Sequence, residues 1–128
     1  MSADDRRRVS SGHALEDVVG YSRAVRVGDQ IWVAGTTARG EDLERDAAGQ
    51  AEAAIAIILD ALAELGAGPA DVGRTCLYVT DIADLEAVGR VHGAHFGDAR
   101  PACTGLQVAK LTPGAAKVAI EVTAVASA

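Results

Sequence analysis

Residues 46–66 read DAAGQAEAAIAIILDALAELG and contain the clearest helical pattern of the chain. Apolar side chains recur on one face of this segment, at Ile55, Ile58, Leu59, Leu62 and Leu65. This spacing is typical of an amphipathic helix packed on a core. Asp46 is a residue type that caps helix starts, while Gly66, Gly68 and Pro69 are residue types that end helices. A helix over 46–66 is therefore predicted.

Two short strands are predicted before this helix. Residues 21–27 alternate in polarity, and Gly28-Asp29 supplies a tight turn into the apolar run 31–34, which together predict a hairpin. Gly35 follows directly. A glycine at the end of an apolar strand lets a ligand or another backbone approach closely.

A strand, a helix and two more strands are predicted after it. Residues 74–80 are rich in strand-forming types, and Thr80-Asp81 can cap a second helix that runs to about Phe96. Strands over 103–109 and 117–125 follow, separated by a Thr112-Pro113-Gly114 turn. The predicted order is β-β-α-β-α-β-β, in one α+β domain.

Two helices can cover only one face of such a sheet. In the last strand, Val118, Ile120 and Val122 alternate with apolar or small residues that face the other way. We expect the uncovered face to meet another copy of the chain, because a large exposed apolar face is rare in a monomer.

Composition fits one compact unit over residues 1–128, with 1–18 expected to be a partly flexible N-terminal segment. A chain of this length buries roughly two-thirds of its unfolded surface. Hydrophobic residues make up 49% of the sequence and aromatic residues only 3%, so the core must be built from Ala, Val, Ile and Leu. No repeat or linker is present.

Charge and hydropathy exclude several partners. The net charge of −6 opposes nucleic-acid binding, and the chain has no evident aromatic platform on which bases could stack. The one basic cluster, Arg6-Arg7-Arg8, is interpreted as a solvated tail and not as a binding patch. No apolar run reaches the roughly 18 residues of a membrane span. We expect a cytoplasmic protein with Cys76 and Cys103 as free thiols.

Cys103 is the first candidate for chemistry, because it follows Arg100-Pro101-Ala102 where the chain enters a strand. Strand ends often display reactive groups. A thiolate at this position would be a nucleophile, and Arg100 is the nearest cation in sequence that would favour it. The alternative is a small buried cysteine of the core.

Glu121 is the second candidate, as the one acidic residue of the last strand. In a partly apolar environment its carboxylate would transfer protons near neutral pH; alternatively it is an exposed strand residue. Tyr21 either contacts a ligand or caps a sheet edge. His13, His92 and His95 do not form a metal-ligand pattern, and no nucleotide-binding or serine-triad motif is present, so no metal or cofactor is expected.

Six short motifs, in order and spacing, resemble the Rid family, also called YjgF-like. They are Gly20 to Gly28, Val33-Ala34-Gly35, Val79-Thr80-Asp81, His95-Phe96-Gly97, Arg100-Pro101-Ala102 and Ile120-Glu121-Val122. The resemblance covers most of the chain. It implies a chorismate-mutase-like fold, a homotrimer, and ligand clefts between subunits.

The resemblance also implies a reaction, the release of ammonia from reactive imines or enamines. In family deaminases an arginine directly after Pro-Ala holds the substrate carboxylate, and the strand glutamate positions a water. Here that position is Cys103, and a thiol has neither the charge nor the fork geometry of a guanidinium. The usual activity on 2-imino acids is therefore not expected.

Two functions follow from these observations. The first is hydrolysis or deamination of another small C–N compound in an intersubunit cleft; the second is a non-catalytic trimer that binds a metabolite or a protein. A ribonuclease activity fits poorly with the acidic composition. The predicted catalytic residues are Glu121 and Cys103, and the predicted substrate contacts are Tyr21, Gly35, Arg100 and Thr104.

Overall fold

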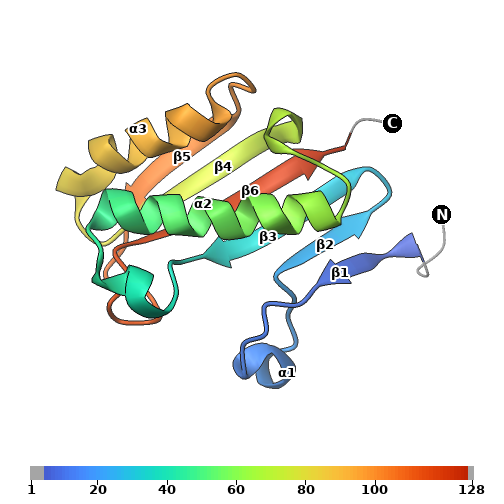
Figure 1. Ribbon diagram of the computed structural model, residues 1–128, viewed down its shortest axis with the longest axis horizontal. Helices are drawn as coiled ribbons and strands as arrows, with labels where there is room; N and C mark the ends of the chain where they lie inside the picture. The colour runs from blue at the N-terminus through green and yellow to red at the C-terminus, as the bar shows by residue number, and fades with distance from the viewer. Residues whose placement is uncertain (1–4, 127–128) are drawn as a thin grey trace.

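The computed structural model describes residues 5–126, which form one six-stranded sheet with two long helices on one face (Figure 1). The helices are α2 (Ala47–Glu64) and α3 (Leu85–Phe96). The strands are β1 (Arg7–Val9), β2 (Ala24–Val27), β3 (Gln30–Thr36), β4 (Val72–Val79), β5 (Ala102–Gln107) and β6 (Val118–Val125). Shorter elements are α1 (Leu15–Val19) and the 3₁₀ turns η2 (Gly40–Glu44), η3 (Pro69–Asp71) and η4 (Ile82–Asp84).

The strand order across the sheet is β1-β2-β3-β6-β4-β5. All neighbours are antiparallel except β4 and β5, which are parallel and joined by α3. A parallel pair needs a crossover of this length, whereas an antiparallel pair needs only a tight turn. The last strand of the chain thus lies in the middle of the sheet, and β5 lies at its edge.

The ends of α2 have the predicted chemistry. Asp46 Oδ1 accepts a hydrogen bond from the Gly49 backbone N–H at 2.8 Å, which satisfies one of the unpaired donors of the first turn. Gly66 has a φ of 80°, a left-handed conformation that glycine adopts without steric cost. The helix therefore begins and ends where its sequence predicts.

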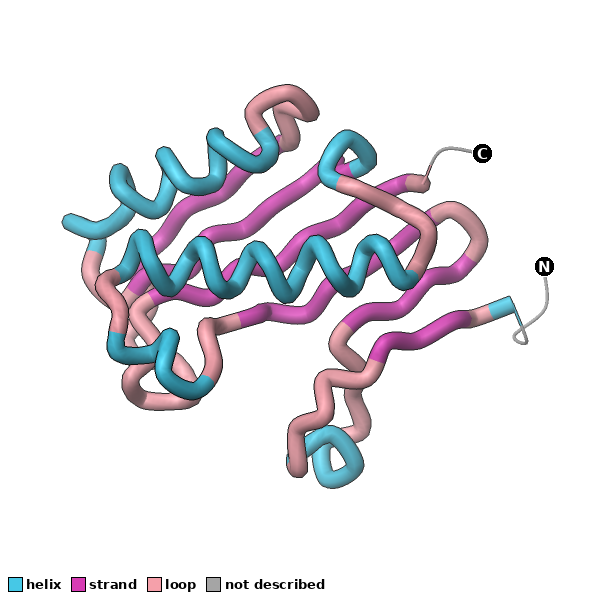
Figure 2. The backbone as a smooth tube through the Cα atoms, viewed as in Figure 1, coloured by secondary structure: helices cyan, strands magenta, loops and turns pink. Residues whose placement is uncertain are grey.

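The core lies between these two helices and the sheet (Figure 2). Alternate residues of β6, namely Val118, Ile120, Val122 and Ala124, are buried beneath α2. Gln50 of α2 is also fully buried, and its side chain donates to Leu43 O at 3.0 Å and accepts from Lys117 N at 2.7 Å. These bonds satisfy a buried polar group and tie the start of α2 to the segment before β6.

The fold prediction is confirmed in class, helix placement and the Gly28-Asp29 hairpin, where Val27 pairs with Gln30. Three details differ. The N-terminal segment contains α1 and β1, for which no element was predicted. Asp81 caps η4, accepting from Ala83 N at 3.0 Å, so α3 begins at Leu85. The strand predicted over 103–109 ends at Gln107.

None of the helices within residues 5–126 combines the length and the apolar character that crossing a membrane requires.

Candidate active site

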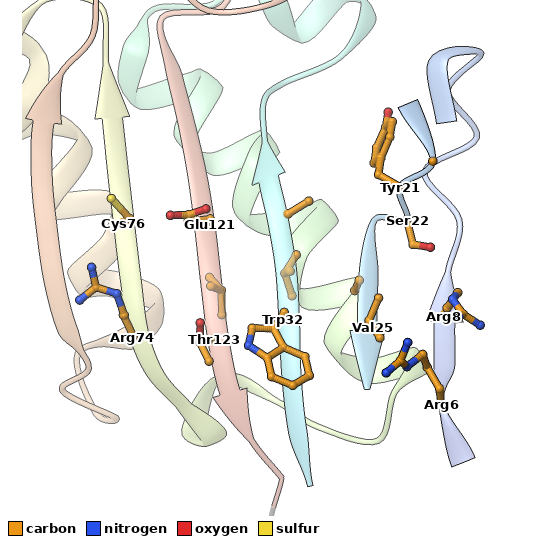
Figure 3. A pocket seen from close by; sticks show the side chains of 15 residues that line it. Arg6, Arg8, Tyr21, Ser22, Val25, Trp32, Arg74, Cys76, Glu121 and Thr123 are labelled. Carbon is orange, nitrogen blue, oxygen red and sulfur yellow. The ribbon is translucent and has the colours of Figure 1, made fainter. Parts of the chain in front are cut away.

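The face of the sheet opposite the helices carries polar and aromatic side chains in register. Cys76 of β4 pairs with Glu121 of β6, and Thr123 of β6 pairs with Trp32 of β3. Residues paired across neighbouring strands point to the same face, and their neighbours along each strand point to the core. We call this side, which has no helix over it within residues 5–126, the open face of the sheet (Figure 3).

A cavity of about 600 Å³ lies on the open face. Its floor includes Trp32, Cys76 and Glu121, and Tyr21 stands at one end. Three arginines also line it, Arg6 and Arg8 from the N-terminal segment and Arg74 from β4.

The residues that line this cavity change two expectations, one about the basic cluster and one about surface aromatic rings. Arg8 belongs to β1 and Arg6 directly precedes it, so the basic cluster is not a solvated tail. Trp32 is 44% exposed, so the chain does offer an aromatic ring on its surface. The arginines could not be placed from sequence, because β1 is held by pairing with β2 and has no apolar alternation of its own.

Glu121 is exposed in the single chain, which fits the alternative of an exposed strand residue. Its carboxylate accepts a 2.5 Å hydrogen bond from the Tyr78 hydroxyl. That bond is the first cause of a raised pKa for Tyr78, because ionising the phenol would place two negative charges side by side. Tyr78 therefore stays a hydrogen-bond donor and fixes the orientation of Glu121.

Cys103 lies on the other face of the sheet. It pairs with Thr75 in β5 and β4, and Thr75 is a buried residue of the helix-covered side that contacts His92 of α3. Two positions on, a Cβ at Gly105 would meet the Leu85 side chain of α3. Cys103 and Glu121 of one chain therefore face opposite sides, and one site can hold both only if two copies contribute to it.

Cys103 is also exposed, whereas Cys76 is buried. The alternative of a core cysteine therefore does not hold for Cys103 in the single chain. Beside it, the Thr75 hydroxyl and His92 Nε2 lie 2.8 Å apart, and burial lowers the pKa of His92. A neutral imidazole is thus favoured next to the strand that carries Cys103.

The remaining predicted contacts fall into two groups. Tyr21 and Gly35 line a second cavity of about 340 Å³, which also contains Arg23 and Arg39. Tyr21 lines both cavities and so lies between them.

Thr104 and Arg100 are in neither cavity. Thr104 pairs with Cys76 and faces the open side from the edge strand. Arg100 is exposed in the turn before β5, with a φ of 53°. Tyr21 thus lines the first cavity together with Glu121 and the second cavity together with Gly35. Cys103 and Thr104 lie on the edge strand β5, and Arg100 lies in the turn before it.

The histidines of α3 have separate partners. His95 Nε2 lies 2.8 Å from Glu52 Oε2, and His92 contacts Thr75. In the part of the chain that the structure describes, no three His, Cys, Asp or Glu side chains are grouped as metal ligands would be.

Comparisons with known proteins place this chain and its fold in one family. The family model described as Endoribonuclease L-PSP matches residues 11–127. An uncharacterised protein of Streptomyces coelicolor is 38% identical over 127 residues, covering 97% of this chain and 95% of its own. A RutC family protein of Pyrococcus abyssi is 33% identical over 95 residues, covering 71% of this chain and 75% of its own.

A solved structure from Mycobacterium tuberculosis, a member of the YjgF family, is 45% identical with a TM-score of 0.85 and covers 94% of this chain and 98% of its own. Another YjgF family protein, from Neisseria meningitidis, is 26% identical with a TM-score of 0.82, and 97% of each chain is covered. The chain belongs to the YjgF family, also called Rid, and has its chorismate-mutase-like fold. The sequence motifs predicted both.

Proposed function

We propose that this protein hydrolyses a carbon–nitrogen double bond of a small metabolite on the open face, in a cleft completed by other copies of the chain. The observation that carries the proposal is the Glu121 carboxylate, held by Tyr78 at 2.5 Å and facing a cavity of about 600 Å³. A general base must be exposed to its substrate and fixed in orientation. Glu121 meets both requirements.

The proposed reaction needs only water as a second reactant. Glu121 accepts a proton from a water molecule while the water oxygen forms a bond to the imine carbon and the imine nitrogen takes up a proton from the solvent. The resulting carbinolamine then loses ammonia: its C–N bond breaks, the nitrogen leaves with the proton that Glu121 returns, and the hydroxyl gives its proton to the solvent and becomes a carbonyl. Proton transfer by one placed carboxylate contributes about 10²- to 10⁴-fold to such reactions.

Assembly into a homotrimer is part of the proposal. The open face exposes Trp32 at 44% and Val125 at 54%, and side chains of this kind on one face favour burial against another subunit. Cys103 and Thr104 lie on the edge strand β5. In such an assembly this edge can reach the open face of a neighbouring copy, which would bring the Cys103 thiol and Glu121 into one site.

Ammonia release tests the proposal. The substrates are imines formed in solution from ammonia-releasing precursors, and the measurement compares the wild-type chain with Glu121→Gln, which keeps the shape of the side chain. We expect turnover in the wild type and a loss of about 100-fold or more in the variant. Equal rates in the two proteins would exclude Glu121 as the base.

A second candidate function is a non-catalytic trimer that binds a metabolite or a protein. The observation that favours it is Cys103 at the position where family deaminases carry arginine. This function predicts saturable binding without turnover. Cys103→Arg distinguishes the two: imine hydrolysis that appears only in this variant would support the binding function, and hydrolysis already present in the wild type would contradict it.

A further inference from the structure

The second cavity contains two arginine side chains. Arg23 precedes β2 and Arg39 precedes η2, and both line this cavity of about 340 Å³. No ion pair formed within residues 5–126 involves either guanidinium. Two positive charges that share a cavity form a favourable environment for an anion.

Arg23 is held in place by the protein. Its Nη1 donates to Thr36 Oγ1 at 2.8 Å and, more weakly, to Gly35 O at 3.4 Å. Thr36 is fully buried and its hydroxyl in turn donates to Ala34 O at 2.8 Å. Both hydrogen bonds that Arg23 makes within residues 5–126 use Nη1, so Nε and Nη2 remain as donors for a ligand, in the fork geometry that suits an oxyanion.

Burial of Arg23 and the nearby charge of Arg39 both lower the pKa of Arg23. Arg39 itself is exposed and donates to Ser11 O at 2.9 Å. Two like charges at such a site repel each other. A bound anion would relieve this repulsion, whereas a neutral ligand would not.

Among the described residues, Glu16 has a carboxylate whose charge acts on Arg23, and this carboxylate accepts hydrogen bonds of its own. The Ser11 backbone N–H donates to Glu16 Oε2 at 2.7 Å, the Ser11 hydroxyl donates to the same atom at 2.5 Å, and the Ser10 hydroxyl lies 3.2 Å from it. Glu16 thus closes the N-terminal segment and, within residues 5–126, forms no direct ion pair with either arginine. Its charge offsets part of the Arg23 charge, but it makes no direct ion pair with the guanidinium donors of Arg23.

We infer that Arg23 and Arg39 form a binding site for the oxyanion group of a small ligand, a carboxylate or a phosphate, in the cavity that Tyr21 and Gly35 also line. Within one chain, this cavity is not lined by Cys103. A ligand anion would therefore be held by Arg23 and Arg39, and not by a residue at the position that follows Pro101-Ala102. Binding at this site does not depend on the hydrolysis proposed above, but a substrate bound here would bear a negative charge.

Binding of butanoate, of its neutral analogue butanamide and of inorganic phosphate to the full chain tests this inference, with affinity followed by chemical-shift titration. We expect saturable binding of butanoate or phosphate, and the stronger of the two identifies the oxyanion. Removing one charge-assisted partner weakens such binding by about tenfold or more, so Arg23→Gln and Arg39→Gln should each show this loss. Arg90→Gln, which removes an exposed arginine of α3, should bind as the wild type does.

Arg39→Gln carries the test if Arg23→Gln fails to fold, because Arg39 is exposed and a glutamine amide can still donate to Ser11 O. Butanamide binding as tightly as butanoate, or unchanged affinity in Arg39→Gln, would overturn the inference, as would no binding of either anion. Glu121→Gln should bind the anion normally. If Glu121→Gln loses hydrolysis but still binds the anion, the result tests the role of Glu121 alone. If the arginine variants lose anion binding, the result tests the oxyanion site alone.

Discussion

The two faces of β6 differ in the kind of side chain that they present. On the helix-covered face, Ile120 is fully buried. On the open face, the adjacent Glu121 is exposed and bonded to Tyr78. Strand neighbours point to opposite faces, so one strand serves a closed core on one side and a candidate active site on the other.

This difference separates stability from chemistry. Substitutions on the covered face should change the free energy of unfolding, because they leave cavities in a packed core. Substitutions on the open face should change binding or turnover and leave the fold of the chain intact. The predictions that follow test this separation, from the largest expected effect to the smallest.

The largest effect is expected for Ile120→Ala. Truncating a fully buried isoleucine typically costs about 2–5 kcal/mol in the free energy of unfolding, measured by chemical denaturation. Ile82→Ala is the matched control, because Ile82 is 52% exposed and surface substitutions usually stay within about 0.5 kcal/mol. Equal losses in the two variants would contradict the assignment of the covered face as the core.

A smaller effect is expected for Tyr78→Phe on the open face. This change removes the hydroxyl that donates to Glu121 and keeps the ring. We expect turnover to fall by about tenfold, the scale of one hydrogen bond to a charged group, with the unfolding midpoint close to that of the wild type. A variant that loses stability but keeps its rate would show that the Tyr78 hydroxyl serves the fold and not the site.

The smallest effect is expected in the pH dependence of stability, through His92 on the covered side. Burial lowers its pKa in the folded state below the ordinary value of 6.5, so the unfolded chain binds the proton more strongly. The stabilising contribution is complete above that value and is lost as the pH falls through the lowered pKa.

Unfolding free energies measured from about pH 7.5 down to about pH 5 should therefore fall less steeply for His92→Gln than for the wild type. His13→Gln is the control, because His13 is exposed. An identical slope in the wild type and His92→Gln would contradict the assignment of a burial effect to His92.

Local patterns in the sequence were enough for much of the fold. The 3.6-residue period of 46–66 and the alternation of β6 predicted the long helix, the two-faced strand and a sheet covered on one side. These features depend on neighbours along the chain, which a sequence displays directly.

Features set by pairing between distant strands could not be predicted. Cys103 and Glu121 were predicted to share an intersubunit cleft, but the sequence did not show that the register Thr75–Cys103 and Cys76–Glu121 puts them on opposite faces of one chain, so that two copies must supply them. Tyr78 was missed as the partner of Glu121, because only the β4–β6 register brings them together. A one-residue change in register would reverse either relation.

The central claim is that Glu121 on the open face carries the chemistry. Ammonia release should be measured for Glu121→Gln and Cys103→Ser at equal concentration with the same imine. The account predicts a loss of about 100-fold or more for Glu121→Gln and a rate within a few-fold of the wild type for Cys103→Ser, which keeps a small polar group on the edge strand. An abolished rate in Cys103→Ser together with a normal rate in Glu121→Gln would contradict it.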